Sequence, residues 1–369
     1  MIRIPSWQHA WQLVSRRWRR PTTLRVEEIQ AVLAHYDLGG WRLAEPLLTG
    51  NTVNVALHTG RGKKVLKRYI GPWPHQATEH SILTHLAGLG FPVPNLTLNT
   101  SGRTYTEFGD RAFALLDFVE GHAINNYILK PQTHRQCVAQ AGDMLARYHQ
   151  VIAGFIPQGE KMDGFRRDSL GLYRDVAWHL EVLDCVAAAR PVVADALDDF
   201  LRGISPHLRR DLVAVGRHYE KLDPELPRLP IHADYVPRNL LYWENQIAAV
   251  LDFESACVNF RALDVARGLT SFAPAGRSGV DEALAEVFLK AYCARQPLLS
   301  TEVKLLPDFF RWRQLRNIVW RVERLARQPH VWSRPQVLAT VRARWDENLW
   351  MKTHGEQLTQ NLRQAVFQS

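Results

Sequence analysis

Cysteine and long apolar runs are the two features that this sequence has least of. It contains four cysteines in 369 residues, Cys137, Cys185, Cys257 and Cys293, with no C-x-x-C pair and no metal-ligand spacing. This usage is more typical of reduced thiols than of a disulfide framework. A candidate transmembrane helix is excluded because no run of about 18 apolar residues occurs, and the N-terminus lacks the apolar core of a signal peptide. We therefore expect a soluble cytoplasmic protein.

Composition and charge exclude further classes. Hydrophobic residues at 46% and charged residues at 22% are ordinary globular values, and the length predicts two lobes or two domains. The formal net charge is +9, but the arginines are dispersed, with local density at 16–20 and 311–327. No recognised nucleic-acid motif occurs, so we do not expect nucleic-acid binding. The charge also weighs against a polycationic substrate, which usually needs an acidic pocket.

The first 20 residues have the pattern of a basic, tryptophan-rich amphipathic helix. Its apolar stripe consists of Trp7, Trp11, Val14 and Trp18. Such a helix can lie on an anionic membrane surface, but we favour docking on the parent domain. A second helix is expected from Thr22 or Thr23 to about His35, so residues 1–37 are predicted to be a helical extension.

From Trp41 the apolar period changes from helical to alternating, which predicts antiparallel strands before a helical region. We expect strands at 43–48, 55–59, 64–69, 104–108 and 113–118. Helical patterns follow at 132–152, from 172 to about 222 with a break near 203–207, and from 264 onward. The predicted fold class is therefore α+β.

The densest polar motif is the block from Ile231 to Leu241, in which His232, Asp234 and Asn239 form an H-x-D-x-x-x-x-N pattern. Thirteen residues after Asn239, Asp252 ends a second apolar segment and is followed by Phe253. One aspartate can accept the proton of an attacking hydroxyl group, while the amide and the other aspartate hold Mg²⁺ on phosphates. The two blocks have the frame of a kinase catalytic loop and metal-binding loop.

A matching phosphate-binding half lies upstream. Lys67 lies on a predicted strand, and Glu79 opens the next helix. A kinase needs a lysine that holds the α and β phosphates and a glutamate that orients it. The Gly50-Asn51 turn, one strand before Lys67, can bring backbone N–H groups close to phosphate oxygens.

With both halves in this order, residues 38–325 resemble the aminoglycoside phosphotransferase superfamily of small-molecule kinases, which includes choline kinases and type II homoserine kinases. Protein kinases are less similar, because Ala233 and Val236 stand where they carry Arg and usually Lys. The resemblance implies a protein-kinase-like bilobal fold. Its small antiparallel N-lobe would span 38–118 and its larger helical C-lobe 119–369, with a hinge near 115–121.

The function implied is ATP- and Mg²⁺-dependent phosphorylation of a hydroxyl group on a small molecule, such as an amino alcohol, an amino acid or an aminoglycoside-type antibiotic. The alternatives are a protein-serine/threonine kinase of the same fold and a non-catalytic nucleotide-binding regulator. The residues implied are Asp234 as the catalytic carboxylate; Asn239 and Asp252 as metal ligands; Lys67, Glu79, Gly50, Asn51 and the hinge residues Asp117, Phe118 and Val119 for the nucleotide; and His232 and Asp264 as support.

Two positions depart from the superfamily pattern. Ala233 and Arg238 both stand where glycine is usual. Arg238 could approach the transferred phosphoryl group, bind an anionic group of the substrate, or point to solvent. Our hypothesis is that Arg238 binds a carboxylate or phosphate group of the substrate, because it directly precedes Asn239. Between residues 311 and 324, five arginines mostly lie off the apolar stripe of the predicted helix. This pattern is typical of a helix side that faces solvent or an anion.

Overall fold

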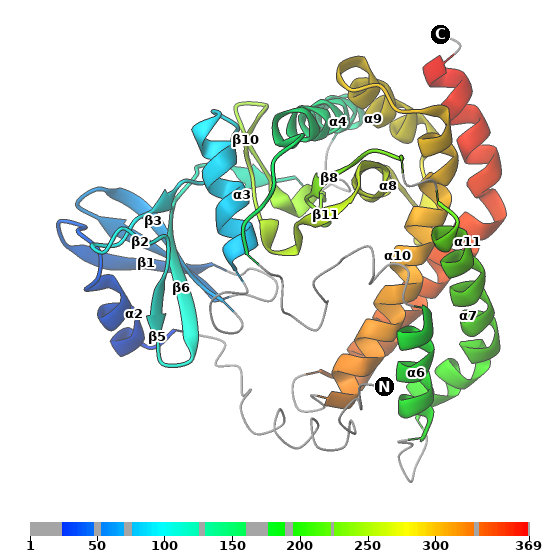
Figure 1. Ribbon diagram of the computed structural model, residues 1–369, viewed down its shortest axis with the longest axis horizontal. Coiled ribbons are helices and arrows are strands. Elements are labelled where there is room, and N and C mark those ends of the chain that lie inside the picture. The colour runs from blue at the N-terminus through cyan, green and yellow to red at the C-terminus, as the bar shows by residue number, and fades with distance from the viewer. Residues whose placement is uncertain are drawn as a thin grey trace.

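The computed structural model places a small antiparallel sheet beside a larger, mainly helical part (Figure 1). It describes residues 24–47, 53–69, 76–124, 130–159, 176–188, 195–222, 225–327 and 332–367. The predicted α+β fold with an antiparallel N-terminal sheet and a helical C-terminal part is confirmed. The helix predicted over 1–20 and the Gly50-Asn51 turn lie outside the described residues.

The N-lobe sheet is antiparallel and has the strand order β1-β2-β3-β6-β4, with β5 paired to β6. Its strands are β1 (Trp41–Leu47), β2 (Val53–Thr59), β3 (Gly62–Arg68), β4 (Leu96–Thr97), β5 (Thr106–Phe108) and β6 (Arg111–Asp117). All five strands predicted from the sequence are present, and β4 is added.

Each face of this sheet is covered by one helix, and the strand period decides which side chain meets which helix. Leu66, Phe113 and Leu115 form a core with α2 (Val26–Leu33). The alternate positions of β6 pack with α3 (Ala77–Gly88) in the larger core. Lys67, one residue after Leu66, therefore faces α3.

The C-lobe helices lie on the other side of the molecule (Figure 1). They are α4 (Pro131–Ile152), α6 (Val176–Ala188), α7 (Ala196–Glu220), α8 (Arg261–Phe272), α9 (Glu282–Arg295), α10 (Ser300–Arg327) and α11 (Arg334–Phe367). The predicted break near 203–207 is wrong, because α7 continues through Pro206. Buried Leu208, Leu212 and Val215 keep the helix packed beyond the proline.

Short strands between the two parts carry the predicted catalytic and metal-binding loops. They are β8 (Arg228–Ile231), β9 (Leu240–Trp243), β10 (Gln246–Val250) and β11 (Cys257–Phe260). The strand β7 (His122–Ala123) pairs with β9, and β12 (Pro274–Ala275) and β13 (Gly279–Val280) form a separate two-stranded sheet. In the register, Ile231 pairs with Cys257 and Leu240 pairs with Val250. The loop after Ile231 contains the 3₁₀ turn η1 (Pro237–Asn239), and the loop after Val250 contains the 3₁₀ turn η2 (Phe253–Ser255). Each loop therefore begins beside the point where the other one ends.

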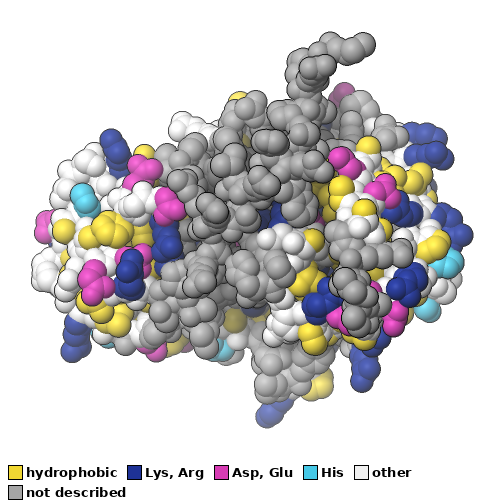
Figure 2. All heavy atoms as spheres, turned by 90° about the horizontal axis from the view of Figure 1, so that it is seen from below, with side chains coloured by type: hydrophobic (Ala, Val, Ile, Leu, Met, Phe, Trp, Pro, Cys, Tyr) yellow, Lys and Arg dark blue, Asp and Glu magenta, His cyan; other side chains and the backbone are white. Residues whose placement is uncertain are grey.

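The surface of the described residues mixes charges of both signs. Figure 2 shows Lys and Arg side chains interspersed with Asp and Glu side chains at both ends of one face. Within the described residues, no helix has the length and apolar character that a membrane crossing requires.

A buried ion pair joins the start of α8 to the start of α10. Arg261 donates from Nε and Nη2 to the two carboxylate oxygens of Glu302 at 2.8 and 2.7 Å, and also to the Pro297 carbonyl. The two side chains are only 7% and 2% exposed. Glu302 also accepts the Leu299 N–H at 2.8 Å. Among the described residues, the charge of each partner is compensated mainly by the other and by these hydrogen bonds.

We predict that Glu302→Gln lowers the free energy of unfolding by about 3–5 kcal/mol, because it leaves the Arg261 charge buried and unpaired. Urea unfolding followed by circular dichroism measures the change. The control is Asp199→Asn, which breaks the exposed Asp199–Arg202 pair on α7 and should hardly move the midpoint. Equal effects of the two substitutions would contradict a stabilising role for the buried pair.

Candidate active site

A fully buried carboxylate, Asp264 at the start of α8, holds the backbone of the 232–239 loop. Its two oxygens accept the N–H groups of His232 at 2.6 Å and Ala233 at 2.8 Å. His149 Nε2 on α4 lies 3.3 Å from the same carboxylate, and its Nδ1 is 2.7 Å from Tyr292 Oη. Burial is acceptable because each carboxylate oxygen is hydrogen-bonded. The loop is therefore anchored to α8 and α4 directly before Asp234.

His232 joins this loop to the segment that carries Asp252. Its Nε2 donates to the Leu251 carbonyl at 2.9 Å, and its Nδ1 accepts the Asp234 N–H at 3.3 Å. These partners require a neutral ring with the proton on Nε2. The ring also packs against Phe253, with centroids 4.5 Å apart. The contacts position two loops and leave no ring nitrogen of His232 available for proton transfer.

Two non-glycine residues of the loops have left-handed backbone conformations. Ala233 has φ 63° and Asp252 has φ 68°. Aspartate visits this region more readily than alanine, for which it costs roughly 1–2 kcal/mol. Ala233, which stands where glycine is usual in similar kinases, thus adopts the backbone conformation that glycine favours. The hydrogen bonds to Asp264 hold it in this conformation.

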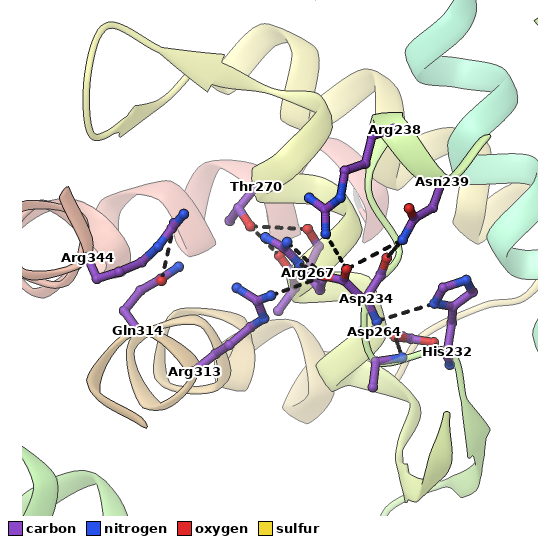
Figure 3. Close-up of polar contacts among 12 residues, drawn as sticks. His232, Asp234, Arg238, Asn239, Asp264, Arg267, Thr270, Arg313, Gln314 and Arg344 are labelled. Atoms are coloured by element: carbon purple, nitrogen blue, oxygen red, sulfur yellow. Dashed lines mark hydrogen bonds and ion pairs between the residues drawn. The ribbon is translucent and has the colours of Figure 1, made fainter. Parts of the chain in front are cut away.

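Three arginines surround the Asp234 side chain (Figure 3). Arg267 donates to Oδ1 from Nη2 at 2.9 Å and from Nε at 3.3 Å, and Arg313 donates to Oδ1 at 3.2 Å. Arg238 forms an ion pair with Oδ2. Burial by itself raises the pKa of Asp234, but the charges of Arg267, Arg313 and Arg238 outweigh it and hold the pKa well below its usual value. The carboxylate is therefore ionised at neutral pH.

Asn239 lies beside the segment that carries Asp252, and both side chains contain oxygen atoms of the type that hard cations prefer. The Asn239 Nδ2 donates to the Asp234 carbonyl at 2.9 Å, so its Oδ1 remains as the potential ligand. The Leu251 N–H donates to the Asn239 carbonyl at 2.8 Å, which holds Asp252 beside it. A carboxamide oxygen and a carboxylate together fit a divalent cation that also binds phosphate oxygens.

Lys67 meets these groups from the N-lobe. Its Nζ donates to Glu79 Oε1 at 2.8 Å and lies 3.8 Å from Asp252 and 4.0 Å from Glu254. Burial by itself lowers the pKa of Lys67, but Glu79 and the other nearby acidic groups raise it well above its usual value. The ammonium group is therefore charged and aimed at the metal-binding segment.

The hinge residues begin with Asp117, the last residue of β6, and two of their amides already donate hydrogen bonds within the protein. The Asp117 N–H donates to the Asn95 carbonyl at 2.9 Å, and the Phe118 N–H donates to the Lys63 carbonyl at 3.1 Å. An adenine edge beside this segment would not meet those two amides. Nucleotide contact by Asp117, Phe118 and Val119 stays a prediction.

The structure brings most of the predicted site residues together around the 232–239 and 251–256 loops. The arginines Arg267 and Arg313 were not predicted from the sequence as part of the site. Arg267 lies three residues after Asp264, on the same face of α8. Helical spacing could therefore have indicated that Arg267 lies near the site. Arg313 belongs to the off-stripe arginines of α10, but the sequence did not indicate which group it faces.

Known proteins resemble this chain in sequence and in fold. A homoserine kinase of Parvibaculum lavamentivorans is 26% identical over 306 residues, which is 82% of this chain and 87% of that protein. The solved aminoglycoside phosphotransferase from Alicyclobacillus acidocaldarius has a TM-score of 0.61 at 22% identity, covering 96% of this chain and all of that one. Amicoumacin kinase in complex with AMP-PNP, Ca²⁺ and Ami has a TM-score of 0.64 at 15% identity, covering 91% and 95%.

The two structural similarities show that the fold is that of the protein-kinase-like phosphotransferases, as predicted. The model of the phosphotransferase enzyme family matches residues 44–301, which include both loops, Lys67 and Glu79. This chain belongs to the phosphotransferase enzyme family.

Proposed function

We propose that the protein is a small-molecule kinase that transfers the terminal phosphoryl group of ATP, with Mg²⁺, to a hydroxyl group. The observation that carries the proposal is the convergence of a buried lysine–glutamate pair with a carboxylate and a carboxamide on two adjoining loops. Lys67 lies 3.8 Å from Asp252, and Asn239 lies beside Asp252 and directly contacts Asp234. This is the set of groups that phosphoryl transfer by kinases requires.

Each group has one task in this proposal. Lys67, oriented by Glu79, binds the α and β phosphates. Asn239 and Asp252 hold the divalent ion, which neutralises charge on the phosphate oxygens when it is bound. Support for a nucleotide and a divalent ion comes from the amicoumacin kinase complex with AMP-PNP and Ca²⁺.

Asp234 orients the acceptor hydroxyl group and accepts its proton as the new O–P bond forms. Its depressed pKa makes it a weak base, but the loose transition state of phosphoryl transfer depends more on positioning than on early proton removal. The bond between the γ phosphorus and the β–γ bridging oxygen breaks, and ADP leaves. His232 and Asp264 contribute by fixing the loop rather than by touching the reactants.

The acceptor class proposed is a small molecule with a free hydroxyl group: an amino alcohol, an amino acid or an aminoglycoside-type antibiotic. The homoserine kinase relative favours small-molecule acceptors. The protein-kinase and regulator alternatives have no supporting observation among these comparisons.

We predict that Asp234→Asn lowers kcat about 10²–10⁴-fold, because it removes the carboxylate that receives the hydroxyl proton. ATP turnover with Mg²⁺ should be measured across a panel of hydroxyl metabolites and aminoglycosides. Asp184→Asn, which changes an exposed aspartate on α6, serves as the matched control. Stimulation by one compound, retained in the control and absent from Asp234→Asn, is the expected result. Unaltered turnover in Asp234→Asn would contradict the role of Asp234 as the catalytic carboxylate.

We predict that Lys67→Met and Glu79→Gln each lower kcat/KM for ATP by about 10²-fold, and that the double variant loses little more. The two side chains act as one unit, so their effects are not additive. A double-mutant cycle on kcat/KM measures the coupling. Additive losses, about 10⁴-fold in the double variant, would show that Glu79 does not work through Lys67.

We predict that EDTA abolishes turnover, that Mg²⁺ restores it, and that Asp252→Asn raises the Mg²⁺ concentration needed for half-maximal activity at least about tenfold. Removing a charged oxygen ligand weakens binding of a hard cation. Titration of activity with Mg²⁺ at saturating ATP is the measurement. Glu254→Gln, which alters the neighbouring carboxylate, tests whether the effect is specific to Asp252.

A further inference from the structure

The acceptor side of the site carries a surplus of positive charge. Arg238 from η1, Arg267 from α8 and Arg313 from α10 converge on the single carboxylate of Asp234. Arg267 and Arg313 are only 12% and 17% exposed, whereas Arg238 is 64% exposed. Two desolvated guanidinium groups and one exposed group therefore contact the same carboxylate.

A fourth arginine adds to this field. Figure 3 shows Arg344 of α11 in contact with Gln314 of α10, and Arg344 also forms an ion pair with Glu347. Burial, Arg344 and Arg238 together lower the pKa of Arg267, although Asp234 acts in the opposite direction. Burial is the largest of these effects, and with the smaller contributions of the two arginines it outweighs the carboxylate that contacts Arg267 in the described part of the chain. Partly buried cations of this kind are stabilised by a further anion.

The position of the cluster relates that anion to the acceptor. Asp234 receives the acceptor hydroxyl group in the proposed reaction, so the rest of the acceptor has to lie beside Asp234. Arg267 and Arg313 donate to Oδ1 and Arg238 to Oδ2, which places their guanidinium groups around the same space. Guanidinium groups match carboxylate and phosphate groups through paired N–H donors. A cationic acceptor would be repelled there.

We infer that the acceptor carries an anionic group: it is a hydroxyl compound whose carboxylate or phosphate group is bound by Arg267, Arg313 and Arg238. The inference rests on the proposed function, because it assigns the acceptor to the space beside Asp234. Among the three acceptor classes, it selects the carboxylate-bearing one and disfavours amino alcohols and polycationic antibiotics. The bound anion draws guanidinium groups away from Asp234 and leaves a carboxylate oxygen for the hydroxyl group.

The first test measures anion binding without turnover. The full-length protein is saturated with AMP-PNP and Mg²⁺, so that the nucleotide's own phosphate positions are filled, and is titrated calorimetrically with inorganic phosphate and with malonate. We expect Asp234→Asn to bind these anions at least about tenfold more tightly, because the competing carboxylate has lost its charge. Arg313→Gln should bind them at least about tenfold more weakly. Arg202→Gln on α7 is the matched control and should leave binding unchanged.

The second test measures turnover with acceptors that differ in charge. L-homoserine is compared with L-homoserinamide, which lacks the carboxylate, and glycerol 3-phosphate with glycerol; 3-amino-1-propanol is the cationic probe. In one of the two pairs, we expect the member that carries the carboxylate or phosphate group to be preferred at least about tenfold in kcat/KM. Preference within the homoserine pair indicates a carboxylate, and preference within the glycerol pair indicates a phosphate. Arg313→Gln should reduce that preference mainly by raising KM. Arg267→Lys keeps the positive charge but removes the paired N–H donors of the guanidinium group, and it should also raise KM.

The outcomes separate the inference from the proposed function. Anion affinity that is unchanged in both Asp234→Asn and Arg313→Gln, or turnover that prefers 3-amino-1-propanol, would overturn the inference and leave the arginines as positioning residues for Asp234. Loss of AMP-PNP binding in the wild-type protein would instead refute the proposed function. Anion binding that responds to both substitutions, together with turnover that prefers an acceptor carrying a carboxylate or phosphate group, supports the inference.

Discussion

The buried carboxylate of Asp264 is the contact on which the geometry of the site depends. It accepts two consecutive backbone amides, those of His232 and Ala233, and so fixes where the next residue, Asp234, begins. The same helix presents Arg267 one turn later to the Asp234 side chain. A single rigid element therefore holds both the backbone of the loop and the charge of its reactive carboxylate, which is how a site on a loop gains the precision of a site on a helix.

The two halves of the site have opposite charge imbalances. On the nucleotide side, one ammonium group, that of Lys67, lies within 4.0 Å of carboxylates from Glu79, Asp252 and Glu254. On the acceptor side, the one carboxylate of Asp234 meets three guanidinium groups. A divalent cation would balance the first imbalance and an anionic acceptor the second. The reactants themselves would thus complete the electrostatics of the site.

Most of the fold could be predicted because its cause is local. Alternation along β3 puts Lys67 on the face opposite Leu66, and so against the helix that carries Glu79. The spacing of Asp234, Asn239 and Asp252 reflects two short loops that start and end on paired strands. The break expected near 203–207 was wrong because local signals predicted it, whereas long-range packing of the apolar side of α7 decides the outcome.

The sequence by itself determined the family-type motifs, the order of strands and helices, and the residues that meet the phosphates and the metal in the proposed reaction. Only the tertiary structure decided what surrounds Asp234. Arg267 and Arg313 reach it from 33 and 79 positions away, on two different helices. Helical periodicity tells which side chains share a face, but it does not tell which other element that face will meet. The charge of the acceptor pocket is therefore a property of how α8 and α10 pack around the loop.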